Sequence, residues 1–438
     1  MRVRSWLASR RATNSTQDSN FSFSNNQSQP PKQYHASDAS SSSDNTPSTT
    51  STETSSVSLQ SNLSLQTLPS VPSLQKITPE TLNVSSLCLD SLKPQQNHLP
   101  VTCLVVQDNL LYAASSHEIN VYDRTSLSLI DSFNDKDSSV GSVKSVTFCD
   151  GKIFSAHQDC KIRVWKVSST TKHHKLVTTL PTPNDLLRRS VLPKNYVNVR
   201  RHKKLLWIKH ADAVTGLAVN DNNGLIYSVS WDKSLKVWRA SDLQCLESIK
   251  AHEDAVNAVA VSVDGKVYTG SADCRIRVWG KPLNEKRHVL VATLEKHKSA
   301  VNALALNDDG SVLFSGACDR SILVWEREDS ANHMVVTGAL RGHNKAILTL
   351  INVSDLLLSG SADQTVRIWK EGHDGKYFCL SVLVGHRKPV KTLAAVWDTD
   401  NDVVSVFSGT LDGEIKKVAG VGFTLQPRYC QKNEFVKY

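Results

Sequence analysis

The chain has 438 residues, of which 39% are apolar, 6% are aromatic and 21% are charged, and its formal net charge is +9. A chain of this length can bury a large core, and it contains no apolar run of about 18 residues, so membrane-spanning helices of ordinary length are excluded. Nine Cys residues without any Cys-x-x-Cys pair predict free thiols in a reducing compartment.

Residues 1–80 are predicted to form a disordered tail. The stretch ASDASSSSDNTPSTTSTETSSVSLQSNLS is dominated by Ser, Thr, Asn and Gln, and it lacks the apolar periodicity that would offset the entropy of ordering the backbone. The opening, MRVRSWLASRR, is basic and superficially suits an organelle transit peptide. A basic start to a disordered tail is the preferred interpretation, because composition alone says little about targeting.

Residues 81–425 repeat one pattern: a His, a short apolar strand, a Ser/Thr-rich strand that ends in Asp, and a third strand that ends in Trp. The stretch from His252 to Trp279, HEDAVNAVAVSVDGKVYTGSADCRIRVW, is a complete copy. The Trp residues at positions 238, 279, 325 and 369 lie 41, 46 and 44 residues apart. This period is typical of a four-stranded propeller blade, and counting the degenerate copies gives seven blades.

The first two copies are degenerate. The first, residues 101–123, has Tyr122 in place of the Trp and no matching Asp. The second, residues 141–165, ends on Trp165 and has Ser139 where the His is expected. Both keep the alternation of short apolar strands and turns, so they are counted as blades 1 and 2.

A basic insertion separates blades 2 and 3. Trp165 and Trp238 lie 73 residues apart where about 44 would suffice, which places the insertion at residues 168–206. This segment contains nine Lys and Arg residues and one acid, Asp185, and so accounts for most of the net charge of the chain. It could attract a phosphate backbone, an acidic partner, or a nuclear import receptor through RRHKK at residues 200–204, or it could be a solvated linker.

The last copy closes the ring. It runs from His386 to Val418, keeps Asp412, and has Val418 in place of the Trp. A ring of sheets leaves open edges unless its last blade is completed, and the apolar segment Asn83–Asp90 is predicted to be the missing fourth strand of blade 7. Residues 426–438 are predicted to form a C-terminal tail.

Polar residues recur at fixed places within the repeats. A hydroxyl lies four residues before each repeat Asp, at Ser155, Ser228, Thr269, Ser315, Ser359 and Ser408. A hydroxyl, an imidazole, a carboxylate and an indole supply complementary donors and acceptors, and buried polar groups are tolerated when each finds a partner.

This pattern resembles the WD40 repeat family, in which these four residues form a buried hydrogen-bonded tetrad. The resemblance implies four complete tetrads: His210, Ser228, Asp232 and Trp238; His252, Thr269, Asp273 and Trp279; His297, Ser315, Asp319 and Trp325; His343, Ser359, Asp363 and Trp369. A catalytic Ser-His-Asp triad is needed once, whereas these sets recur in four successive blades, so we predict structural roles and no enzyme activity. No cofactor and no metal site are predicted.

The chain as a whole resembles the plant JINGUBANG-like group of WD40 proteins. The shared stretches are MRVRSWLAS at the start, LPSVPSLQ at residues 68–75, PKNYVNVRRHKKLLWIKHADAV at residues 193–214 and CLSVLVGHRKPVK at residues 379–391. The resemblance implies a non-catalytic plant regulatory protein of the nucleus and cytoplasm. No membrane attachment is expected, because the chain contains no apolar run long enough to span a bilayer. Its implied partners are other proteins, with transcription factors or signalling proteins foremost.

The usual interaction surface of WD40 proteins is the top face of the propeller, formed near the start of each first strand and just before each repeat Asp. Matching the motifs places there Lys144, Gln158, Thr215, Trp231, Asn257, Ala272, Asn302, Cys318, Leu348, Ala362, Lys391 and Leu411. Trp231 stands out, because large aromatic residues are enriched at binding hot spots and neighbouring blades have small residues at this position. The alternative is that Trp231 packs over the adjacent blade.

We therefore expect an all-β, seven-bladed and monomeric propeller that acts as a protein-binding scaffold. Two other functions stay open: nucleic-acid binding through the basic insertion, and substrate reception for a cullin-type ubiquitin ligase. The residue after the blade Trp is never Asp, so the Trp-Asp-x-Arg ending of many ligase-bound plant WD40 proteins is missing, which disfavours the second.

Overall fold

The computed structural model of this chain describes residues 71–74, 87–92, 99–134, 141–168, 173–200, 203–282, 285–327, 334–372, 374–398 and 403–422. Most of the predicted N-terminal tail, Ser139 and the whole predicted C-terminal tail lie outside these ranges.

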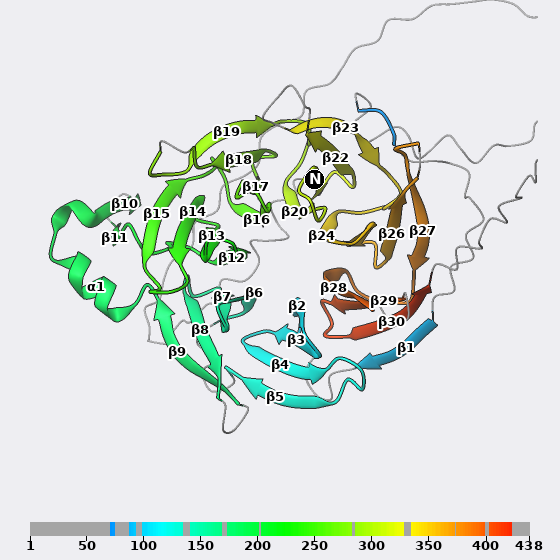
Figure 1. Cartoon of the computed structure of the whole chain (residues 1–438), viewed down its shortest axis with the longest axis horizontal. Helices are drawn as coiled ribbons and strands as arrows, with labels where there is room; N and C mark the ends of the chain where they lie inside the picture. Colours follow the sequence, from blue (N-terminus) through cyan, green and yellow to red (C-terminus); the bar gives the residue numbers. More distant parts are fainter. Residues whose placement is uncertain are drawn as a thin grey trace, which may run out of the picture. The chain divides into compact units, whose positions relative to one another are not determined.

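The described residues form seven four-stranded antiparallel sheets that follow one another around a ring (Figure 1). Blade 1 contains β2 (Val101–Gln107), β3 (Leu110–Ser115), β4 (Glu118–Asp123) and β5 (Leu129–Phe133); blade 2 contains β6 (Val143–Cys149), β7 (Lys152–His157), β8 (Ile162–Val167) and β9 (His174–Leu180); blade 3 contains β12 (Val214–Asn220), β13 (Leu225–Ser230), β14 (Ser234–Arg239) and β15 (Cys245–Lys250).

The second half of the ring repeats this arrangement. Blade 4 contains β16 (Val256–Val261), β17 (Val267–Ser271), β18 (Ile276–Gly280) and β19 (Val289–Leu294); blade 5 contains β20 (Val301–Leu306), β21 (Val312–Ala317), β22 (Ile322–Arg327) and β23 (Met334–Leu340); blade 6 contains β24 (Ile347–Val353), β25 (Leu356–Ser361), β26 (Val366–Glu371) and β27 (Tyr377–Leu383); blade 7 contains β28 (Val390–Asp398), β29 (Val403–Thr410), β30 (Ile415–Gly422) and β1 (Leu87–Leu92).

The ring is closed. The first strand of each blade lies beside the first strand of the next, and β28 of blade 7 lies beside β2 of blade 1. The prediction of a seven-bladed β-propeller is confirmed. The outer strand of blade 7 comes from the N-terminal side of the chain: β1 pairs with β30, with Leu87 opposite Ala419 and Leu92 opposite Ile415. This strand overlaps the predicted segment Asn83–Asp90 and ends two residues later.

The core lies between neighbouring blades. Tyr268 of blade 4, for example, packs in one cluster with Leu323 and Trp325 of blade 5. A sheet covered on both faces has buried side chains at consecutive positions, and every residue of β25 is buried. The two-residue alternation that marks a half-exposed strand is therefore weak in this chain.

A short segment of the predicted tail belongs to the folded ring. The backbone of Pro72 accepts a hydrogen bond from the Ala339 N–H at 2.9 Å, and the Leu74 N–H donates to the Ala339 carbonyl at 3.1 Å, so residues 71–74 run beside the outer strand β23. Val71 is buried against blade 5, and Leu74 packs against the cluster between blades 5 and 6. These two apolar side chains explain why this segment docks although it lies within residues 1–80.

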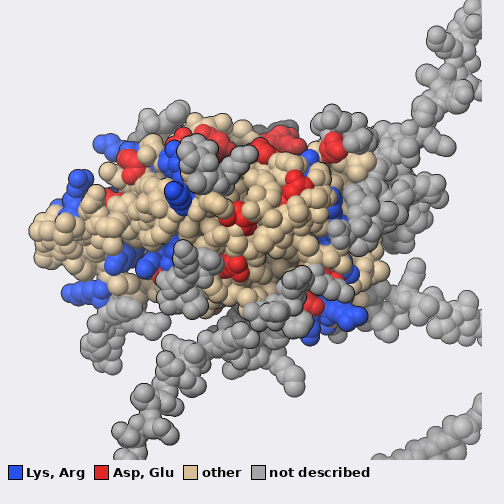
Figure 2. Space-filling model, turned by 90° about the horizontal axis from the view of Figure 1, so that it is seen from below, with Lys and Arg blue, Asp and Glu red and all other residues tan. Residues whose placement is uncertain are grey.

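The predicted insertion is shorter than the sequence suggested, because β9 is the outer strand of blade 2. The remainder forms a projection that we call the arm, residues 181–206, with the helix α1 (Pro183–Ser190), a 3₁₀ turn (Pro193–Asn195) and a hairpin of β10 (Tyr196–Arg200) and β11 (Lys203–Leu206) (Figure 1). Figure 2 shows Lys and Arg side chains around this end of the molecule. No helix in the described ranges is long and apolar enough to cross a membrane.

Candidate protein-binding site on the upper rim

Each of the four predicted tetrads is assembled in the structure. In blade 3 the Trp238 indole N–H donates to Ser228 Oγ at 2.9 Å, Ser228 Oγ lies 2.8 Å from His210 Nε2, and His210 Nδ1 lies 3.0 Å from Asp232 Oδ2. Blades 4, 5 and 6 repeat these contacts at 2.8–3.0 Å. The donors and acceptors of each set are directed at one another.

The indole fixes the direction of the protons in each tetrad. An indole N–H can only donate, so the hydroxyl accepts from it and donates its own proton to the imidazole Nε2, which leaves the proton of a neutral imidazole on Nδ1. Burial lowers the pKa of His210, in keeping with a neutral ring. Burial raises the pKa of Asp273, but the hydrogen bonds from His252 and from backbone N–H groups outweigh it and lower that pKa to about 2. These groups stabilise the blades and present no free nucleophile.

Blade 2 obtains its imidazole from an unexpected position. His157, in β7, lies 2.8 Å from Ser155 Oγ, which also accepts from the Trp165 indole at 2.8 Å. Asp159 pairs instead with Arg163, through two hydrogen bonds of 3.2 and 2.9 Å. The repeat Asp of this blade is therefore not part of a tetrad.

Blade 7 obtains its carboxylate from an unexpected position. His386 Nε2 lies 2.7 Å from Ser408 Oγ, and His386 Nδ1 lies 3.0 Å from Glu414 Oε2. Asp412, which the sequence matched to the repeat Asp, accepts a hydrogen bond from the Thr410 hydroxyl instead. Val418 is buried where blades 2 to 6 have an indole.

A second set of buried histidines links the outer parts of neighbouring blades. His174 Nδ1 lies 2.7 Å from Asp131 Oδ2 and its ring stacks on Phe133 at 4.5 Å. His288 makes the corresponding 3.0 Å contact with Glu247 between blades 3 and 4. Within the described ranges, no group of three or more His, Cys, Asp or Glu side chains could hold a metal ion.

The predicted surface residues lie on one rim of the ring. The first strand of each blade begins where its second strand ends, as in the pairs Val143 with His157 and Val214 with Ser230. We call this edge the upper rim. The second residues of the seven first strands form a ring around it: Thr102, Lys144, Thr215, Asn257, Asn302, Leu348 and Lys391. All seven are half-buried.

Four of these seven residues join neighbouring blades. Their side chains donate hydrogen bonds to the first backbone carbonyl of the next first strand: Thr102 to Val143 at 2.6 Å, Thr215 to Val256 at 2.7 Å, Asn257 to Val301 at 3.0 Å and Asn302 to Ile347 at 2.9 Å. The structure thus gives Thr215, Asn257 and Asn302, which the sequence assigned to partner binding, a structural role as well.

Blades 2 and 7 are joined to the next blade by a different residue and a different hydrogen bond, in which the side chain accepts. Ser145 Oγ accepts a hydrogen bond from the Leu217 N–H at 3.2 Å, and Thr392 Oγ1 accepts one from the Leu104 N–H at 2.9 Å. Ser145 and Thr392 each follow one of the two rim lysines. Lys144 and Lys391 therefore have no part in joining the blades.

The two lysines lack a carboxylate partner among the described residues. Burial lowers the pKa of Lys144 to about 8, and the positive charge of Lys391 adds to this effect. Burial also lowers the pKa of Lys391. Lys144 Nζ lies 5.9 Å from the centre of the Trp231 ring, which is a cation–π distance.

The residues that precede the turn Asp form a second ring on the upper rim. Their backbone N–H groups donate to the loop before the first strand, as Trp231 does to Ala213 at 3.1 Å and Leu411 does to Pro389 at 3.2 Å. This ring contains Gln158, Trp231, Ala272, Cys318, Ala362 and Leu411 in blades 2 to 7. Neither ring contains an acid. The turn Asp residues that follow the second ring are bonded to the tetrad His residues in blades 3 to 6, and Asp212 and Asp254 in the preceding loops accept hydrogen bonds from the next N–H.

Comparison with known proteins matches five segments to one family, described as WD domain, G-beta repeat: residues 203–239, 243–280, 288–326, 334–370 and 377–417. These five segments are WD40 repeats. From the second segment on, each matched repeat begins in the outer strand of one blade and ends in the third strand of the next, so repeat and blade differ in phase by one strand.

Several curated proteins are similar to this chain over part of its length. It is 24% identical over 222 residues to a ribosome biogenesis protein WDR12 homolog of Drosophila persimilis, covering 47% of this chain and 51% of that protein. It is 22% identical over 281 residues to the Aedes aegypti homolog, covering 59% and 63%. It is 27% identical over 162 residues to zinc finger CCCH domain-containing protein 62 of Arabidopsis thaliana, covering 36% and 37%. The chain thus spans about half the length of the first of these relatives.

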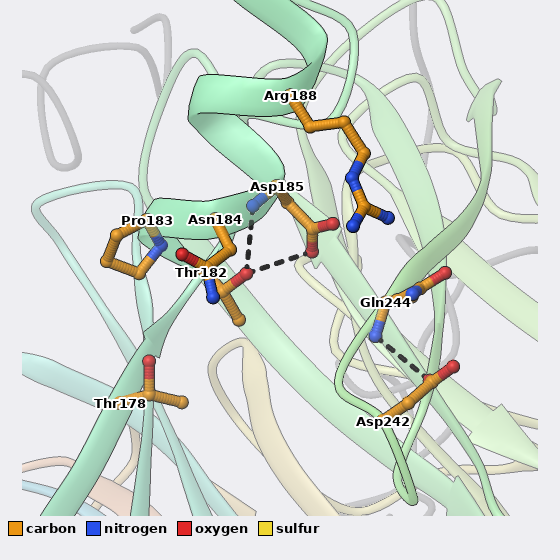
Figure 3. Close-up of a pocket in the computed structure, with 8 residues that line it drawn as sticks. All are labelled: Thr178, Thr182, Pro183, Asn184, Asp185, Arg188, Asp242 and Gln244. Atoms are coloured by element: carbon orange, nitrogen blue, oxygen red, sulfur yellow. Dashed lines mark hydrogen bonds between the residues drawn. The ribbon is translucent and has the colours of Figure 1, made fainter.

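A polar cleft of about 370 Å³ lies on the outer side of the WD40 ring, at the base of the arm (Figure 3). Thr182 and Asp185 at the start of α1 face Asp242 and Gln244 across it, and Arg188 extends from the helix toward it. Thr182 caps α1 by accepting a hydrogen bond from the Asp185 N–H at 3.1 Å. None of the residues that line this cleft belongs to the upper rim, so the two sites are separate.

The repeat pattern did not predict the roles of His157 and Glu414, although both positions carried a signal. His157 lies two residues after Ser155, and alternate residues of a strand share one face of a sheet. Glu414 lies two residues after the repeat Asp, where Ser234 of blade 3 and Thr365 of blade 6 also reach the imidazole. The inter-blade links of Ser145 and Thr392 carried no such signal, because they depend on how blades pack.

Proposed function

We propose that this WD40 protein is a non-catalytic scaffold that binds a protein partner across the upper rim, with an acidic side chain of the partner entering between Lys144 and Lys391. The contact surface continues over Gln158, Trp231 and Leu411. Resemblance to plant regulatory WD40 proteins supports action in the nucleus and cytoplasm.

This proposal rests on one observation: Lys144 and Lys391 neither join two blades nor have a carboxylate partner among the described residues. A half-buried ammonium group without a carboxylate destabilises the folded state, whereas a hydroxyl or amide at the same place would join two blades as it does elsewhere in the ring. A binding partner that supplies a carboxylate removes the cost of leaving these charges unpaired. Trp231, beside Lys144, adds the aromatic surface that binding hot spots favour.

Two pathways fit a scaffold of this kind. The names of the WDR12 homologs support a place in ribosome biogenesis. Resemblance to the plant group supports a regulatory pathway with transcription factors or signalling proteins as partners. The identity of the protein bound at the upper rim distinguishes the two pathways.

Affinity capture with the full chain tests the proposal. Lys144→Met combined with Lys391→Met keeps side-chain length and removes both charges, and Trp231→Ala removes the adjacent aromatic surface. We expect both variants to lose partners that the wild type retains, and we expect the wild type to release these partners as the salt concentration rises.

Lys281→Met is the matched control, because Lys281 is exposed and follows β18 at the end of that strand remote from the upper rim. It should retain every partner. An unchanged partner set for the double Lys variant and for Trp231→Ala, with folding verified by circular dichroism, would remove the upper rim from consideration as the binding surface.

A further inference from the structure

The arm is held in one conformation by contacts within itself and with the ring. The Asn195 side-chain amide donates to the Arg189 carbonyl at 2.8 Å, and the Trp207 N–H donates to the Asn195 carbonyl at 2.9 Å. The Arg189 guanidinium lies 4.7 Å from the centre of the Trp207 ring. Leu186 and Trp207 pack against the core cluster between blades 2 and 3. The arm therefore presents a defined surface.

The arm exposes several apolar side chains that do not pack against the ring. Leu187 and Val191, four residues apart and so on one side of the helical turn, are 72% and 74% exposed. Leu192, Tyr196, Val197 and Val199 are also exposed. Leu186 is the residue of α1 that packs on the ring, so the exposed side chains are not its missing core. A cluster of this kind on one projection is typical of a binding surface.

Basic side chains surround this apolar surface. Arg188, Lys194 and Lys204 are exposed. The acid of the arm, Asp185, is buried and bonded to the helix cap Thr182. Figure 2 shows the same arrangement, with an uncharged end flanked by Lys and Arg. A partner that covers this surface must offer acidic groups at its edge and apolar groups at its centre.

We infer that the arm is a second docking surface, separate from the upper rim, for a protein segment that contains both acidic and apolar side chains. Charge alone would fit a phosphate backbone equally well. The exposed aliphatic side chains decide between them, because Leu187 and Val191 gain by burial against apolar groups and have nothing to bind on a phosphate.

An array of 15-residue peptides, bound to the labelled full chain, tests this inference. One set combines acidic and apolar residues in varied order, a second contains acidic and polar residues, and a third combines basic and apolar residues. A labelled single-stranded RNA is the nucleic-acid probe. We expect binding to the first set only, and a loss of at least ten-fold for Leu187→Ser combined with Val191→Ser.

The controls separate the arm from general stickiness and from electrostatic binding. Val384→Ser alters a side chain of similar exposure, 76%, outside the arm and should change nothing. Arg188→Gln with Lys194→Gln and Lys204→Gln should weaken peptide binding and reduce its dependence on salt. The inference is overturned by an absence of arm-dependent peptide binding, or by RNA binding that the basic variant abolishes and the Leu187 and Val191 variant leaves intact.

Discussion

Blades 3 to 6 take their imidazole from the loop before the first strand and their carboxylate from the turn after the second strand. Blade 2 takes its imidazole from the second strand, at His157, and blade 7 takes its carboxylate from the far side of the turn, at Glu414. The buried hydroxyl is bonded to an imidazole in all six of these blades. The fold requires an imidazole beside the buried hydroxyl or a carboxylate beside that imidazole. More than one sequence position can place these groups there.

Blades 2 and 7 also differ from the others at the upper rim. They are the two blades with a Lys as second residue of the first strand, and in both the next residue, Ser145 or Thr392, accepts a hydrogen bond from the neighbouring blade instead. In blades 3 to 5 the second residue makes that bond itself. The residues that hold the ring together are thus relocated where the surface carries charge, which is the arrangement expected if the charge serves binding.

Removing the blade Trp should cause the largest loss of stability. Comparing it with the matching change in blade 7 shows how a complete tetrad differs from a blade that lacks the indole. Trp369 is fully buried, so Trp369→Ala should lower the free energy of unfolding by about 4 kcal/mol, whereas Val418→Ala at the matching place in blade 7 should lower it by about 2 kcal/mol. Urea denaturation followed by circular dichroism measures both. Equal losses would show that the indole adds nothing beyond what blade 7 achieves without it.

Acidification should weaken the complete blades in two stages. The folded-state pKa of His210 is lowered by burial, so the unfolded chain binds protons first and stability falls as the pH drops below about 6.5. The folded-state pKa of Asp273 is lowered to about 2 from an ordinary 3.8, so about 2 kcal/mol of stability is lost as the pH falls from about 4 to about 2. Melting temperatures across this range measure both stages, and Asp273→Asn should diminish the second. A constant melting temperature between about pH 7 and 5 contradicts the first stage.

Two conservative variants identify the carboxylate of blade 7. Glu414→Gln weakens a charge-assisted hydrogen bond to His386 and should cost about 1–2 kcal/mol, more than Asp412→Asn, which leaves Thr410 an acceptor. Because Glu414 raises the pKa of His386 against the effect of burial, Glu414→Gln should also lower that pKa further. NMR titration of the His386 ring measures this shift, and a larger shift in Asp412→Asn would restore Asp412 to the tetrad.

Neutralising a rim lysine should slightly raise the free energy of unfolding, whereas the variants above lower it. Lys144→Met should raise the free energy of unfolding at neutral pH by about 1 kcal/mol, because solvent moderates the cost of this half-buried charge. The folded-state pKa of about 8 lies below the ordinary 10.5, so the wild type recovers stability as the pH rises between these values and the difference should vanish. A variant less stable than the wild type would mean that Lys144 has a structural partner and is not held for binding.

The repeat pattern alone allowed the ring and four of its tetrads to be predicted. A recurring His, hydroxyl, Asp and Trp at a period near 44 residues describes local units, and each blade satisfies its own hydrogen bonds within about 30 residues of chain. The outer strand β9 was counted as part of the basic insertion, because the repeat is recognised by its first three strands. Val71–Leu74 was assigned to the tail, because two apolar residues in a Ser-rich stretch give no periodic signal.

The sequence by itself determined the number of blades, the residues of the regular tetrads and the positions that face the upper rim, because these follow from contacts within one repeat. Tertiary structure decided which residues are free to bind. Whether Asn302 joins two blades while Lys391 does not, and whether Leu187 is exposed while Leu186 is half-buried, depends on a neighbouring blade that lies far away in the chain. Contacts between repeats are set by how sheets pack, and no single repeat contains that information.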